Sequence, residues 1–193
     1  MMTPQDVLDF WFLPPGAPGH GAARAVWFRK DDAFDADIGA RFGATIAQAV
    51  AGGLREWDEQ GPQGVLARII VLDQFTRNAG RGTPAAFAGD ALALAAAQAL
   101  VARGADTALA PLQRWFAYLP FEHAEDARMQ AQSVALFGAL AAADPGFADA
   151  LDYAHRHRGV IVRFGRFPHR NAILGRASTA EEAAYLAQPG SGF

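Results

Sequence analysis

The sequence contains no cysteine, and Lys30 is the only lysine among its 17 basic residues. The absence of cysteine excludes disulfides, a thiolate nucleophile and cysteine-based zinc or iron–sulfur sites. The amino terminus shows no basic start followed by an apolar run, so no secretory signal is expected. These absences fit a reducing compartment, and the sequence predicts a cytoplasmic protein.

Charge and hydrophobicity further limit the class of protein to which the chain can belong. The chain has 193 residues, of which 51% are hydrophobic and 19% are charged, with a net charge of −3. That length and composition predict one globular domain over residues 1–193. A slightly acidic chain is not expected to bind nucleic acid. The longest apolar stretch, residues 91–102, is interrupted by Gln98, so no membrane span is expected.

Helix signals dominate the chain. Thr3 and Pro4 are typical of a helix start, and Gly165 is placed to end a long helix. Strand signals are weak, because the β-branched run at Val160 continues a helical spacing. The fold class is therefore all-α, a single domain of about eight helices. We expect helices near residues 4–12, 35–50, 61–78, 90–103, 111–119, 122–142, 145–164 and from 178 onward.

The first polar motif lies on the helix expected at residues 61–78. Asp73 falls on the same face as Leu66 and Ile69, so its carboxylate points into an apolar stripe. A buried carboxylate needs partners, and Arg77 follows one helical turn later. Two interpretations remain open. Asp73 could hold Arg77 as a structural tie, or it could orient Arg77 and Asn78 toward a ligand.

The second motif places a histidine among acids at Glu122, His123 and Glu125. We expect this run at the start of a helix, where acids are favoured and Asp126 caps free N–H groups. A histidine flanked by carboxylates suits general acid–base chemistry. The spacing matches no strong metal-binding motif, so neither a metal site nor a cofactor is predicted.

The third motif is a cationic loop. No Asp or Glu occurs between Tyr153 and Ala180, so any acidic partners of its basic residues must come from elsewhere in the chain or from a ligand. Arginine suits the capture of carboxylate or phosphate. In the preceding helix His157 shares the core-facing stripe, whereas His155 does not. The polar residues predicted to bind are His157, Arg163, Arg166, His169, Arg170, Asn171 and Arg176.

These motifs resemble the bacterial family known as domain of unknown function 924. Thr76 stands where proline is expected, and Ala124 where serine is expected. The resemblance implies an all-helical fold of antiparallel hairpins similar to tetratricopeptide repeats, and it implies no established activity. It covers nearly the whole chain and is carried by Val7-Leu8-Asp9-Phe10-Trp11-Phe12, Asp73-Gln74-Phe75-Thr76-Arg77-Asn78, Tyr118-Leu119-Pro120-Phe121-Glu122-His123, Arg163-Phe164-Gly165-Arg166-Phe167-Pro168-His169-Arg170-Asn171, Leu174-Gly175-Arg176 and Ser178-Thr179-x-Glu181-Glu182.

Three functional hypotheses follow from these motifs. In the first, Arg166 and Arg170 clamp a small anion, phosphate or carboxylate, in a pocket. The chemistry would then fall to the predicted catalytic residues, His123, His169, Glu122 and Asp73. The predicted binding residues would be Arg77, Asn78, Glu125, His157, Arg163, Arg166, Arg170, Asn171 and Arg176.

The second hypothesis is an interaction module, in which helical hairpins bind a peptide or protein partner. The third is structural, in which the same side chains form an ionic network between helices. The sequence does not decide whether the protein is an enzyme, and it names no protein partner.

Overall fold

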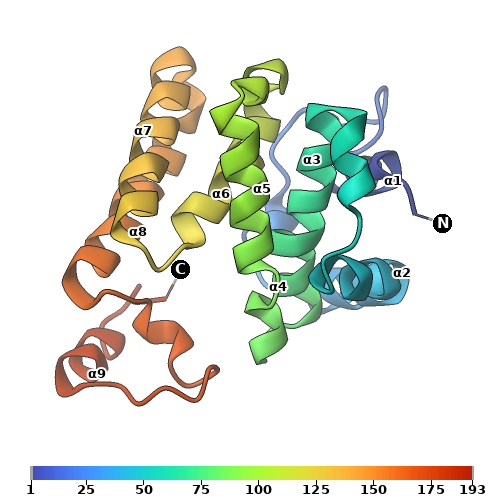
Figure 1. Ribbon diagram of the computed structural model, residues 1–193. Coiled ribbons are helices and arrows are strands. Elements are labelled where there is room, and N and C mark those ends of the chain that lie inside the picture. The colour runs from blue at the N-terminus through green and yellow to red at the C-terminus, as the bar shows by residue number, and fades with distance from the viewer. Residues whose placement is uncertain (1, 193) are drawn as a thin grey trace. The chain divides into compact units, whose positions relative to one another are not determined.

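The computed structural model describes residues 2–192 (Figure 1). All regular structure in this range is helical, which confirms the predicted all-α class. The contacts divide the chain into two compact units. The first contains the residues up to 81 and residues 85–120, and the second contains residues 82–84 and those from 121 onward.

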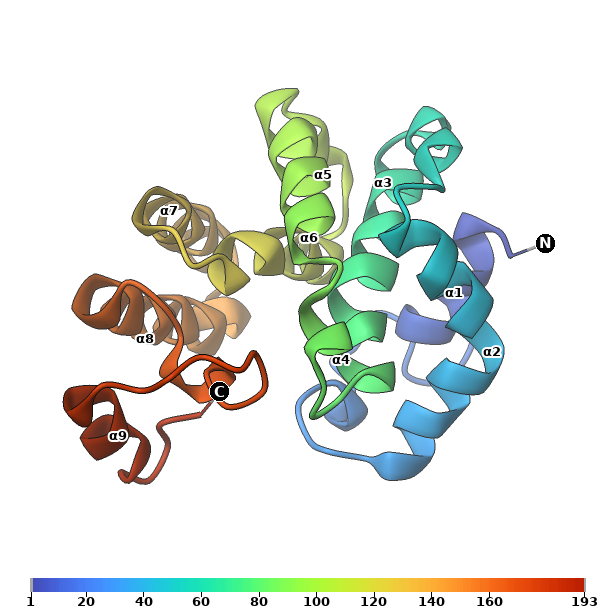
Figure 2. The ribbon, with the colours of Figure 1, turned by 60° about the horizontal axis from the view of Figure 1, so that its bottom comes forward.

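Helices of the first unit pack around an aromatic and aliphatic core. Val7, Leu8 and Trp11 form the buried face of the first helix. This helix begins after Thr3, as predicted, with a capping box between Thr3 and Asp6. Figure 2 shows these helices from below. They are α1 (Pro4–Phe12), α2 (Asp32–Val50), α3 (Pro62–Ile69), α4 (Thr76–Ala79), α5 (Asp90–Ala102) and, up to Pro120, α6 (Pro111–His123).

A π-helical turn, η3 (Ile70–Phe75), joins α3 to α4 without a break. The helix predicted over residues 61–78 is therefore present, but its middle part has the i to i+5 hydrogen bonds of a π-helix. The Thr76 hydroxyl donates to the Leu72 carbonyl at 2.7 Å. A Cβ atom on Gly89 would lie 2.1 Å from that carbonyl oxygen, so only glycine permits this approach. Single π-turns are frequent at functional sites, and this one carries Asp73.

One stretch differs from the expectation about membranes. Residues Pro84–Ala102 are together long and apolar enough to cross a bilayer by length and composition alone, because a turn at Pro84–Phe87 extends α5. Core helices of soluble proteins pass the same test. In the first unit α5 packs against α3, and Ala93, Ala97 and Leu100 are buried.

The second unit contains α7 (Ala127–Ala143), α8 (Ala148–Phe164) and α9 (Ala180–Leu186). Helices α7 and α8 form a hairpin through the turn at Pro145–Phe147 (Figures 1 and 2). Gly165 ends α8 at a φ of 70°, as predicted. Counting α3, η3 and α4 as one rod, the described residues contain eight helical segments labelled α, as expected.

The boundary between α6 and α7 corrects the prediction. We expected a helix to stop at Pro120 and the next to start at Glu122. Instead α6 runs through Pro120 to His123, and Asp126 caps α7 by accepting from the N–H groups of Arg128 and Met129. His123 therefore lies at a helix C-terminus, where the helix dipole favours a cation.

Candidate functional site

The motif of Asp73 belongs to the first unit. The side chain of Asp73 is fully buried, and its Oδ1 lies 3.0 Å from Nη1 of Arg77. The amide of Gln74 donates to its Oδ2 at 2.6 Å. The predicted tie between Asp73 and Arg77 is thus present.

Arg77 also binds an acid that the sequence did not single out. Its Nη1 and Nη2 donate to the two carboxylate oxygens of Asp90 at 2.8 and 3.1 Å. Burial alone would lower the pKa of Arg77, but the carboxylates of Asp73 and Asp90 raise it. Asn78 donates to Asp35 at 2.7 Å. These predicted ligand-binding groups are therefore engaged by acids of their own unit.

The other two motifs meet within the second unit. Arg176 donates two parallel hydrogen bonds to Glu125, at 2.6 and 2.9 Å. Oε1 of Glu125 also accepts from the backbone N–H of Phe167 at 2.8 Å. Burial raises the pKa of Glu125, but Arg176 and the Phe167 N–H outweigh it and the net pKa is lowered. Glu125 is therefore a fixed carboxylate that anchors the cationic loop.

A second arginine of the loop is held in the same way. Arg166 donates to both carboxylate oxygens of Glu182, at 2.6 and 2.8 Å. Arg166 and the backbone N–H of Thr179 lower the pKa of Glu182 to about 2. Its place three residues after Thr179 is typical of a helix cap, and this is the one role that the sequence indicates for Glu182. Its second role was not visible because Arg166 lies 16 residues away.

Asn171 joins these two ion pairs. Its Oδ1 accepts from Nε of Arg176 at 3.0 Å, and its Nδ2 donates to Ser178 at 3.0 Å and to Glu182 at 3.4 Å. The side chain is almost fully buried. Arg163, in contrast, forms an exposed pair with Glu181 on the surface of α8. The network therefore contains Arg166, Asn171 and Arg176 but not Arg163.

His157 and His169 each contact the buried ring of Phe167, and His123 lies beside His157. The centroid of the His157 ring lies 5.5 Å from that of Phe167 and 6.2 Å from that of His123. The centroid of the His169 ring lies 5.6 Å from that of Phe167. His155 is exposed, as predicted. We call His123, His157 and His169 the histidine cluster.

Burial keeps two of these imidazoles neutral. It lowers the pKa of His157 to about 3, with a further effect from His123. The pKa of His169 falls to about 4, again first through burial and then through Arg170. Nδ1 of His157 lies 2.9 Å from the Tyr153 carbonyl and 3.3 Å from Oε1 of Glu122. These contacts favour the tautomer with its proton on Nδ1.

Arg170 completes the cluster. Its guanidinium lies 4.6 Å from the centroid of the Phe167 ring and donates to the His123 carbonyl at 3.0 Å. Only 6% of the residue is exposed. Among residues 2–192, no group of three or more His, Asp or Glu side chains is arranged to hold a metal ion.

Comparison with known proteins places this chain in a family. The bacterial family of unknown function DUF924 matches residues 7–190. The chain belongs to DUF924. A solved structure from Agrobacterium tumefaciens, the protein of unknown function ATU0120, is 40% identical and has a TM-score of 0.82. The match covers 95% of this chain and 96% of that one. No protein of curated function matches. Membership of DUF924 therefore supports the fold and leaves the activity open.

Proposed function

We propose that the second unit binds a small organic or inorganic anion, carrying a carboxylate or phosphate group, at the histidine cluster. The observation that carries this proposal is that His157, His169 and the guanidinium of Arg170 all contact the Phe167 ring, with His123 beside His157. Neutral imidazoles and a buried guanidinium can each donate hydrogen bonds to a carboxylate or phosphate group.

The roles within the site differ from those suggested by the sequence. Arg166 and Arg176 are each bound by a carboxylate through two hydrogen bonds. Both arginines would therefore support the loop rather than clamp the ligand, in the way that outer residues orient a site. Arg170 would supply the positive charge for the anion.

Acid–base chemistry is the second part of the proposal. His123 and His169 are only partly buried, whereas His157 is enclosed and oriented by Glu122. A bound anion would favour the protonated form of His169 and raise its low pKa toward neutrality. His123 and His169 could then exchange a proton with the ligand, and this step would need no cofactor.

A ligand screen tests this proposal. Phosphate, sulfate, dicarboxylates and nucleotides would be added to the wild type, His169→Gln, Arg170→Gln and the control His155→Gln, and the melting temperature measured. A ligand of the site should raise the melting temperature saturably in the wild type and in His155→Gln only. Calorimetry in buffers of different ionisation enthalpy should show proton uptake on binding at neutral pH.

The opposite outcome is equally clear. The proposal is wrong if no anion of the panel stabilises the wild type, or if an anion stabilises the wild type, His169→Gln and Arg170→Gln equally. A large loss of stability in Arg170→Gln without any ligand effect would then favour the structural network.

A further inference from the structure

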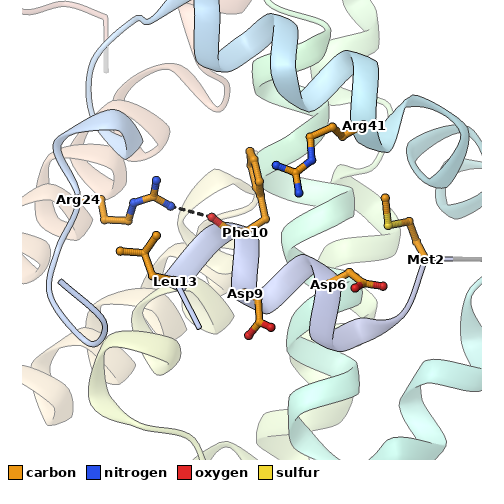
Figure 3. A pocket seen from close by; sticks show the side chains of 7 residues that line it. All are labelled: Met2, Asp6, Asp9, Phe10, Leu13, Arg24 and Arg41. Atoms are coloured by element: carbon orange, nitrogen blue, oxygen red, sulfur yellow. Dashed lines mark hydrogen bonds between the residues drawn. The ribbon is translucent and has the colours of Figure 1, made fainter. Parts of the chain in front are cut away.

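The first unit contains a cavity that none of the polar motifs explains. The cavity is widely open to solvent, and its volume is about 480 Å³. One face of α1 supplies Asp6, Asp9 and Phe10, and the end of that helix supplies Leu13. Arg24 and Arg41 come from the following loop and from α2 (Figure 3).

Arg24 is the unusual group in this wall. The residue is partly buried, and within the described part of the chain it forms no ion pair with a carboxylate. Its Nη1 donates to the carbonyls of Phe10 and Trp11, both at 2.7 Å, which fixes the guanidinium at the end of α1. Burial lowers the pKa of Arg24, yet arginine remains charged at neutral pH. A fixed, partly desolvated guanidinium that forms no direct ion pair favours an anion.

The floor of the cavity is apolar and partly pre-organised. The Phe10 ring stacks on Phe34 at 5.3 Å, and the Arg41 guanidinium lies 4.7 Å from the Phe10 centroid. In Figure 3 the carboxylates of Asp6 and Asp9 point away from the two arginines. Leu13 adopts φ 68° and ψ 147°, a conformation that a leucine rarely takes. Such strained residues concentrate at ligand sites.

From this arrangement we propose that the cavity binds a monocarboxylate with a compact apolar body. The carboxylate would pair with Arg24, and the body would lie against Leu13 and the edge of the Phe10 ring. Asp6 and Asp9 offset the charges of the two arginines, so the wall as a whole is neutral. A dianion such as a phosphate monoester would meet repulsion from both acids and bind more weakly.

Calorimetric titration with three probes tests the expected preference for a single negative charge. Benzoate carries one negative charge, benzamide carries none, and phenyl phosphate carries up to two. We expect the wild type to bind benzoate saturably and more tightly than either of the others. Arg24→Gln should weaken benzoate binding about tenfold or more, since a hydrogen bond to a charged group contributes that much. Arg55→Gln serves as the control, because Arg55 is exposed in the same unit and does not line the cavity.

A second variant protects the test against misfolding, because Arg24 also caps α1. Asp9→Asn removes one repulsive carboxylate and should strengthen phenyl phosphate binding relative to benzoate. Asp6 is left intact because it forms the capping box with Thr3. A gain of binding cannot come from an unfolded protein.

Three results would overturn the inference. They are no saturable binding of benzoate to the wild type, equal binding by a folded Arg24→Gln, and equal affinity of the wild type for benzoate and phenyl phosphate. The cavity lies in the first unit and the histidine cluster in the second. The two proposals are therefore supported or rejected independently.

Discussion

Arg176 and Glu125 are separated by 51 positions in the sequence, and they meet through two parallel hydrogen bonds of 2.6 and 2.9 Å. Nη2 of Arg176 also donates to the Phe167 carbonyl at 3.1 Å, and Glu125 accepts from the Phe167 N–H. The ion pair thus hydrogen-bonds both backbone groups of Phe167, whose ring contacts His157 and His169. These bonds hold the cationic loop in position.

Arg176→Ala should lower the free energy of unfolding by about 2–3 kcal/mol, because a partly buried carboxylate loses its charged hydrogen bonds. Urea denaturation measures this change. Arg163→Ala is the matched control, and its exposed pair with Glu181 should contribute less than about 1 kcal/mol. Equal losses in the two variants would contradict the anchoring role of Arg176.

The buried imidazoles predict a pH dependence of stability. The pKa of His157 is about 3 in the folded protein, against 6.5 for an unperturbed histidine. Between these values the unfolded chain binds a proton that the folded chain does not. Stability therefore falls as pH drops from 6.5 toward 3, by about 1.4 kcal/mol per pH unit for each such group.

Denaturation of His157→Gln and of His155→Gln across this pH range shows how much His157 contributes to the pH dependence of the free energy of unfolding. His157→Gln should flatten the slope, and His155→Gln, which alters an exposed side chain, should leave it unchanged. A slope that is the same in both variants would place the titrating groups elsewhere.

Gly89 should tolerate no side chain. In Gly89→Ala the new Cβ would meet the Leu72 carbonyl oxygen in the π-turn, and backbone must move to relieve the clash. We expect a loss of about 3 kcal/mol or more. Gly43→Ala provides the comparison, since Gly43 lies within α2 with no atom within 4 Å of the added Cβ. That substitution should stabilise the protein by about 0.5–1 kcal/mol. Thermal unfolding of both variants tests the close contact.

At Leu13 we expect the usual order of stability of an alanine and a glycine variant to be reversed. Alanine is normally more stable than glycine within folded elements, but φ 68° favours glycine. Leu13→Gly should therefore have a free energy of unfolding about 1 kcal/mol higher than that of Leu13→Ala, as measured by urea denaturation. Both variants remove the side chain from the cavity and should weaken benzoate binding. Greater stability of Leu13→Ala would show that the backbone there is unstrained.

Part of the candidate site was predictable from short-range signals. The spacing of Asp73 and Arg77 by one helical turn predicted their contact, and the segment without acids predicted that its arginines need distant partners. The partners themselves were not predictable. Arg77 binds Asp90, and Arg166 binds Glu182, because loops bring them together. A carboxylate that caps a helix gives no sign in the sequence that it also binds an arginine.

The helices, most of their ends and the buried positions of Asp73 and His157 were predictable from the sequence. These features depend on hydrophobic periodicity and capping, which act over a few residues. Other features could be seen only in the folded chain: α6 continues through Pro120, Glu125 anchors Phe167, and Arg24 lines a cavity and forms no direct ion pair. Such outcomes depend on where loops place charges in three dimensions, and the free energy of each placement is shared among residues far apart in the chain.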